Sequence, residues 1–149
     1  MKALQMALMA VALVLGMPQG FAKGPEAVTD LDKALDQAKA EKKLLFIQYG
    51  REACGNCQAL RGYVAKNDVR LPKDKFVYVD LNCDDKTTSA AFRKHFKVDG
   101  STLPFVVVAD AEGRQLGGRS GFGSAAEYKK FIQQAQSKKP ADAAKTPAK

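Results

Sequence analysis

Apolar positions recur along the chain with two alternating periods, one typical of helices and one typical of buried strands. A helical period begins after Thr29, which is placed to cap the helix, and continues to Lys42. The run Leu44–Tyr49 then lacks the helical period and is apolar apart from Gln48, which is typical of a buried strand. The first part of the chain is therefore predicted to form a helix followed by a buried strand.

The same alternation continues to residue 136 and predicts the element order α-β-α-β-α-β-β-α. Strands that alternate with helices need crossover connections and favour parallel pairing, whereas the turn Asp110–Gly113 is typical of a hairpin and adds an antiparallel strand. Phe105–Val108 is apolar on both faces, as a central strand between two helical layers is. We therefore predict an α/β fold in which helices flank a central mixed β-sheet on both faces. The remaining predicted elements are a helix from Gln58, a strand over 75–82, a helix over 87–96, strands over 105–109 and 114–116, and a helix that follows the capping box Ser124–Glu127.

Both ends of the chain differ in composition from its middle. Residues 1–22 carry one Lys, then an apolar run that Pro18 ends, and then the small residues Gly20 and Ala22 just before the expected cut. This is the pattern of a secretory signal peptide cleaved after Ala22. The apolar run is shorter than the roughly 20 residues that a membrane span needs. Residues 137–149 are rich in Lys, Ala and Pro and are predicted to be a disordered tail. One domain over 23–136 is thus expected, in a periplasmic or secreted protein.

Charge and cysteine content narrow the classes of function. The formal net charge is +8, of which about +4 belongs to the expected domain without its signal peptide and tail, and this mild excess can attract acidic partners or a membrane surface. No basic run is interleaved with aromatic residues, so the sequence argues against nucleic-acid binding. The chain has three cysteines, Cys54, Cys57 and Cys83. A small domain held together by disulfides usually has a larger and even number of them. In an exported protein this favours redox chemistry.

The motif Cys54-Gly55-Asn56-Cys57 lies between a predicted strand and a predicted helix. The positive end of a helix favours a thiolate at Cys54, and the thiolate is the form that attacks disulfides. Cys57 lies about one turn further on and can resolve a mixed disulfide formed at Cys54. Cys54 and Cys57 are therefore the candidate catalytic pair, with Gly55 letting the turn tighten and Asn56 as an uncharged spacer.

At this point the chain resembles the thioredoxin superfamily. The resemblance rests on the motif at a strand-to-helix turn, on Leu103-Pro104 before a strand 50 residues after Cys54, and on a Gly-rich end that runs into a capped final helix. It implies a thioredoxin-like fold and a thiol–disulfide oxidoreductase without a cofactor or metal. It also implies that Pro104 is a cis-proline beside the redox pair and that Leu103 binds an extended substrate peptide. The implied partners are cysteine-containing exported proteins and a membrane-bound thiol carrier of electrons.

Several positions depart from the family pattern and leave the direction of electron flow open. Ala53 stands where the family usually has Trp, and Asn56 where Pro is common. Gln48 stands where many members have a buried acid, and Glu52 is interpreted as a solvated loop charge that does not replace it. A helix directly before the first clear strand indicates that the usual opening strand is short or lost.

Two other classes of function stay open. One is a soft-metal module that binds an ion such as Cu(I) through Cys54 and Cys57, with or without Cys83. The other is a non-catalytic thioredoxin-like interaction domain with a fixed disulfide. Zinc would need four ligands, and only Cys83 and His95 remain, at no recognised spacing. Cys83 is interpreted as a small buried hydrophobe, with a third redox thiol as the alternative, and Phe122 either lines a substrate groove or packs.

Overall fold

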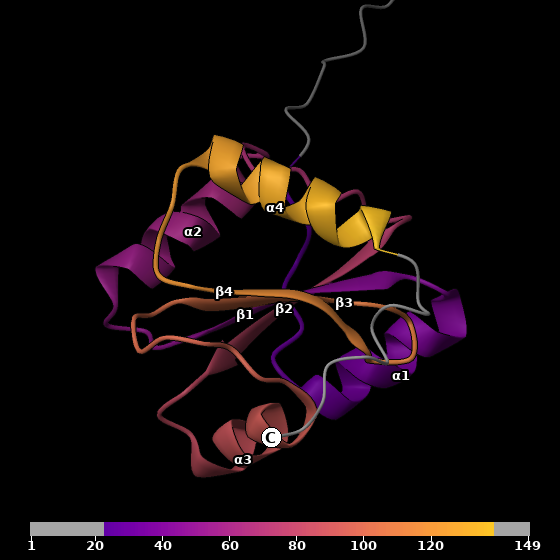
Figure 1. Ribbon diagram of the computed structural model, residues 1–149, viewed down its shortest axis with the longest axis horizontal. Helices are drawn as coiled ribbons and strands as arrows, with labels where there is room; N and C mark the ends of the chain where they lie inside the picture. The colour runs from indigo at the N-terminus through magenta and orange to yellow at the C-terminus, as the bar shows by residue number, and fades with distance from the viewer. Residues whose placement is uncertain (1–22, 139–149) are drawn as a thin grey trace, which may run out of the picture.

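A four-stranded mixed sheet lies between two layers of helices in the computed structural model, which describes residues 23–138 (Figure 1). The strand order is β2-β1-β3-β4, with β1 and β2 parallel and the other neighbouring pairs antiparallel. The predicted α/β fold class and element order are confirmed. The elements are α1 (Leu31–Glu41), β1 (Leu44–Gly50), α2 (Gly55–Ala65), β2 (Phe76–Asn82), α3 (Lys86–His95), β3 (Phe105–Ala109), β4 (Gln115–Ser120) and α4 (Ala125–Ser137).

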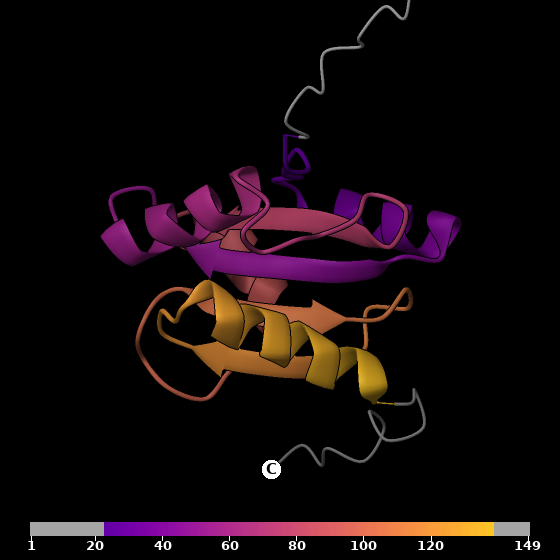
Figure 2. The same cartoon turned by 90° about the horizontal axis from the view of Figure 1, so that it is seen from above.

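The helices divide between the two faces of the sheet, as Figure 1 shows: α2 and α4 cover one face, and α1 and α3 cover the other. Seen from above, α2 lies over the half of the sheet formed by β1 and β2, and α4 over the half formed by β3 and β4 (Figure 2). Successive side chains of a strand point to opposite faces. In β1, Leu45 and Ile47 therefore pack under α1 and α3, whereas Phe46 packs under α2 and α4.

The first helix begins one residue later than the sequence predicts. Asp30 is the N-cap of α1, and its side chain accepts the N–H of Lys33 at 3.1 Å, so the expected cap at Thr29 is wrong. The reason lies in Val28, which forms an isolated parallel bridge with Val79 of β2 and keeps the chain extended up to the cap. This bridge occupies the place of an opening strand, which the sequence predicts to be short or lost.

Glycines in β4 serve close packing. The sequence predicts a strand over 114–116, but β4 continues through Gly117 and Gly118 to Ser120. A Cβ at Gly117 would lie 3.0 Å from the ring of Phe131 in α4. The lack of a side chain thus lets the helix approach the strand, and the strand pairs with β3 along this stretch without ending.

The predicted termini fall largely outside the described residues. The expected signal peptide over 1–22 lies outside them, as does the expected tail apart from its first two residues, and Ser137 ends α4. Within residues 23–138, no helix combines the length and the apolar character that crossing a membrane requires.

Candidate redox site

The cysteine motif lies where β1 ends and α2 begins. Cys54 is the N-cap of α2, and its Sγ accepts the backbone N–H of Cys57 at 3.3 Å. The two cysteines form a disulfide, with their Cα atoms 5.2 Å apart. Cys57 is fully buried, whereas Cys54 is half-buried. The sulfur that a partner can reach is therefore that of Cys54, at the positive end of the helix.

Gly50 brings the redox pair next to the Leu103–Pro104 segment. A Cβ at Gly50 would lie 2.6 Å from Sγ of Cys57 and 3.9 Å from Cβ of Pro104. This proximity arises because β1, which ends at Gly50, pairs with β3, which begins directly after Pro104. The Leu103–Pro104 peptide bond is cis, Pro104 is buried and Leu103 is half-buried. Their role in substrate binding stays a prediction.

The two spacer residues of the motif are exposed at the start of α2. Gly55 does not have a positive φ, and a Cβ there would meet no atom within 4 Å. The residue thus has space for a side chain in the first turn of the helix, and the role of Gly55 in letting the turn tighten stays a prediction. Asn56 lies next to it and is exposed to solvent.

Gln48 connects the redox helix to the sheet. Its side chain is fully buried, and its Nε2 donates a hydrogen bond to the carbonyl oxygen of Cys57 at 2.9 Å. The hydroxyl of Tyr78 on β2 donates to Oε1 of Gln48 at 3.3 Å. Burial is the main cause that raises the pKa of Tyr78, so this hydroxyl remains a donor. The sequence shows Gln48 as a polar residue in an apolar run, at the position where many members of the family that the chain resembles have a buried acid; its contact with Cys57 was not predicted.

A charged pair lies beside Gln48 on the same face of the sheet. Asp80 is the cross-strand partner of Gln48. Its carboxylate accepts hydrogen bonds from Nε of Arg61 at 2.6 Å and from Nη2 of Arg61 at 3.2 Å. This hydrogen bonding is the main cause that raises the pKa of the Arg61 guanidinium. Glu52 is exposed, as predicted. A pocket of about 410 Å³ opens here, lined by Thr29, Glu52, Gln58, Arg61, Asp80 and Asn82.

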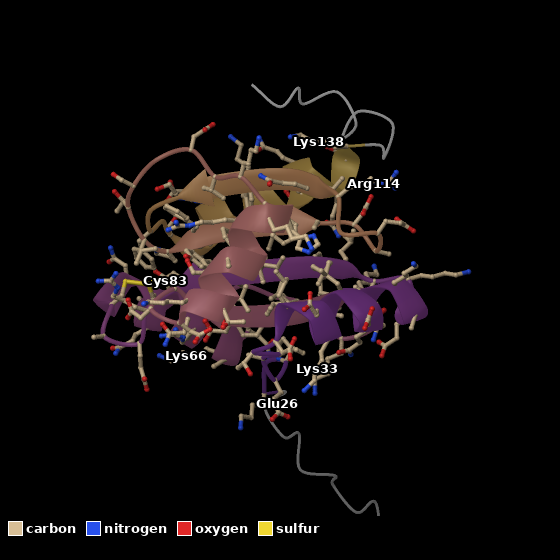
Figure 3. The ribbon with its side chains drawn as sticks, turned by 90° about the horizontal axis from the view of Figure 1, so that it is seen from below. Glu26, Lys33, Lys66, Cys83, Arg114 and Lys138 are labelled. Carbon is tan, nitrogen blue, oxygen red and sulfur yellow. A yellow bond between two sulfur atoms is a disulfide. The ribbon has the colours of Figure 1, made fainter. Side chains whose placement is uncertain are left out.

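Cys83, which Figure 3 labels, directly follows β2. Because Gly50 at the end of β1 pairs with Asn82, Cys83 lies at the end of the sheet where the redox motif begins. Its backbone N–H donates to the carbonyl oxygen of Gly50 at 2.7 Å, and its thiol is free. The interpretation of Cys83 as a buried hydrophobe is confirmed only in part, because the residue lies just after the end of β2 at Asn82 and packs half-buried at the edge of the core. A hydrogen bond with the Cys83 side chain is the main cause that raises the pKa of the Arg51 guanidinium. The charge of Asp84, whose Oδ1 lies 3.3 Å from Nη2 of Arg51, is the second cause.

An aromatic pair lies between α2 and the loop before α4. Phe122 is 36% exposed, more than any other large apolar side chain among the described residues. It stacks on Tyr63, with the ring centroids 5.6 Å apart. The loop is held near the cis-proline, because Gly121 donates its N–H to the carbonyl oxygen of Pro104 at 3.0 Å. Phe122 therefore both packs and presents apolar surface.

The histidine of the chain and the cysteines do not gather into a metal site. His95 is exposed at the end of α3, as expected for a residue on the surface of a helix. Among residues 23–138, no group of three or more His, Cys, Asp or Glu side chains has an arrangement that could hold a metal ion. The copper-binding alternative thus gains no support from the part of the chain that is described.

Comparisons with known proteins agree with this geometry. A family model described as thioredoxin-like matches residues 26–111. A proposed disulphide-isomerase from Bacteroides thetaiotaomicron has 21% identity and a TM-score of 0.63, over 79% of this chain and 98% of that one. Spinach chloroplast thioredoxin f has 18% identity and a TM-score of 0.55, over 80% and 99%. The oxidoreductase DsbH has 18% identity and a TM-score of 0.55, over 87% and 96%. No curated protein matches the sequence.

Proposed function

Because this chain belongs to the thioredoxin-like family, we propose that it is a thiol–disulfide oxidoreductase that acts on cysteines of exported proteins through Cys54 and Cys57. One observation carries the proposal: the accessible sulfur of Cys54 caps a helix and accepts an N–H from its first turn, while its partner Cys57 is buried beneath it. A thiolate at this position is stabilised by the helix N-terminus, which is what a reactive cysteine needs.

The proposed exchange takes place in two steps. The thiolate of Cys54 attacks one sulfur of a partner disulfide, so that a mixed disulfide forms and the other partner sulfur leaves as a thiolate. Cys57, after losing its proton to solvent, attacks the sulfur of Cys54, closes the Cys54–Cys57 disulfide and releases the second partner thiolate. Over the two steps, the disulfide of the partner is broken and the Cys54–Cys57 disulfide is formed, so the partner is reduced by two electrons and the cysteine pair is oxidised. The same steps in reverse donate a disulfide.

The assignment to exported partners rests on the sequence. The signal-peptide pattern over 1–22 supports a periplasmic or secreted protein, whose substrates are cysteine-containing exported proteins. Net reduction in such a compartment needs an electron supply, for which a membrane-bound thiol carrier is the proposed partner. The Leu103–Pro104 segment, next to Cys57 across Gly50, is the proposed contact for the backbone of a bound substrate.

The reduction potential of the pair tests the function and its direction. The purified protein is equilibrated with glutathione or dithiothreitol buffers, and the fraction of Cys54–Cys57 disulfide is measured. A value near −270 mV, the approximate potential of thioredoxin, would support a reductant, and a value near −120 mV would support a donor of disulfides. A disulfide that thiol buffers cannot open would contradict the proposal and favour a non-catalytic interaction domain.

A further inference from the structure

We propose that Gln48 is a positioning residue for the resolving cysteine: its amide forms a neutral latch between Tyr78 in the sheet and the carbonyl of Cys57 in the redox helix. The amide latch is defined by the two hydrogen bonds of Gln48, 2.9 Å to Cys57 and 3.3 Å from Tyr78. This inference rests on the proposed function of Cys54 and Cys57, and it assigns a task to a buried polar side chain that the exchange itself does not use.

The partners of Gln48 determine which end of its amide faces which group. The carbonyl oxygen of Cys57 can only accept a hydrogen bond, so the NH₂ end must point toward it. The remaining oxygen then accepts the hydroxyl of Tyr78, which burial keeps protonated because it raises the pKa of that group. Each group is neutral and complementary to its neighbour. A carboxylate in place of Gln48 has no hydrogen to donate, and it would leave the carbonyl of Cys57 facing a buried negative charge.

The latch holds the first turn of α2 against the strand that carries Gly50. Sγ of Cys57 packs so closely on Gly50 that a Cβ there would lie 2.6 Å away, and Gln48 is two residues earlier in the same strand. Tying the carbonyl of Cys57 to this strand keeps its sulfur within reach of Cys54. Closing the Cys54–Cys57 bond needs the deprotonated sulfur of Cys57 close to Cys54 and releases a partner thiolate, so a preset position raises the effective concentration of Cys57. Since its amide is neutral, Gln48 adds no titrating group beside the cysteine pair.

Two substitutions test the latch by different readouts. Gln48→Met keeps the length of the side chain and removes the amide, and we expect the equilibrium constant for closing the disulfide to fall about tenfold, which is about 30 mV toward a more oxidising potential. Gln48→Glu places a carboxyl at the same site, where burial and the neighbouring carboxylate of Asp80 raise its pKa and the guanidinium of Arg61, which Asp80 holds, opposes that rise. Its protonated form can still donate to Cys57 and its ionised form cannot, so we expect a near-native potential at low pH and an additional inflection as pH rises.

The experiment measures the potential of the pair in glutathione buffers from pH 5 to pH 9, and the rate at which a glutathione mixed disulfide at Cys54 is resolved. The matched control is Gln58→Met in the same helix, because the amide of Gln58 also donates to a backbone carbonyl, that of Glu52 at 2.9 Å, but in an exposed position. The control is expected to keep native values. A native potential and resolution rate in Gln48→Met, or a pH profile of Gln48→Glu parallel to the native one, would overturn the latch alone. A native protein that exchanges no thiols would overturn both proposals.

Discussion

Of the four helices within residues 23–138, three begin with an oxygen cap and the redox helix begins with a sulfur cap. The side chains of Asp30, Asp85 and Ser124 accept backbone N–H groups at 3.1, 2.7 and 3.3 Å at the starts of α1, α3 and α4. At the start of α2 the acceptor is Sγ of Cys54, at 3.3 Å. Oxygen caps stabilise a helix at all times, whereas sulfur is a weak acceptor until it becomes a thiolate. The same local geometry thus serves stability in three places and, in the proposed function, reactivity in one.

The sharpest way to separate these two uses is to exchange the sulfur for an oxygen. In Cys54→Ser the hydroxyl can still cap α2, but the attacking thiolate is gone, so we expect disulfide exchange to be abolished. The free energy of unfolding of this variant should stay within about 1 kcal/mol of that of the reduced native protein. Turnover of a disulfide substrate and urea unfolding measure the two properties. Cys83→Ser, which removes the free thiol near the site, is the control and should keep exchange. Full activity in Cys54→Ser would contradict the assignment.

A substitution of the second cysteine, Cys57, tests the resolving step and leaves the sulfur cap of Cys54 in place. Cys57→Ser leaves the cap sulfur in place and removes the group that resolves the mixed disulfide, so we expect covalent complexes with partner proteins to accumulate. Non-reducing electrophoresis of the exported fraction, followed by identification of the trapped chains, checks this. If Cys57→Ser captures nothing and Cys83→Ser is inactive, the resolving role belongs to Cys83.

An oxygen cap tests the stability side of the comparison. Ser124 and Glu127 form a capping box at the start of α4, far along the chain from the redox pair. Ser124→Ala should lower the free energy of unfolding by about 1 kcal/mol and leave the exchange rate unchanged. Urea titration and a turnover assay measure both. A loss of exchange without a loss of stability would show that this cap, too, serves the chemistry.

The smallest effect expected is on acid stability. The backbone N–H of Thr88 is the main cause that lowers the pKa of Asp85, the cap of α3, below the value near 3.9 of an unfolded chain. A lowered native pKa means a stabilising contribution that is full above the unfolded value and is lost as pH falls through the native value. Asp85→Asn keeps a cap that does not titrate, so its unfolding free energy should fall less between pH 5 and pH 2 in urea titrations. A parallel fall in both proteins would contradict this.

Local patterns were sufficient for most of the fold. The apolar runs of β1 and β3 predict strands buried on both faces, and they are buried so in the structure. The capping box of Ser124 and Glu127 predicts the start of the last helix, because both partners lie within one turn of each other. The cap at Asp30 was missed, because a single cross-strand bridge of Val28 decides it and such a bridge has no local signature.

The sequence by itself determined the redox motif, its place between a strand and a helix, and the segment Leu103–Pro104. These follow from residues close together in the chain and from a family resemblance that they carry. Only the tertiary structure decided that Gly50 lies against both Cys57 and Pro104, and that Gln48 and Tyr78 form the amide latch. The physical reason is the register of the sheet. It brings together, at one end of the sheet, strand ends that are far apart in the sequence, and it places the buried amide of Gln48 next to its partners.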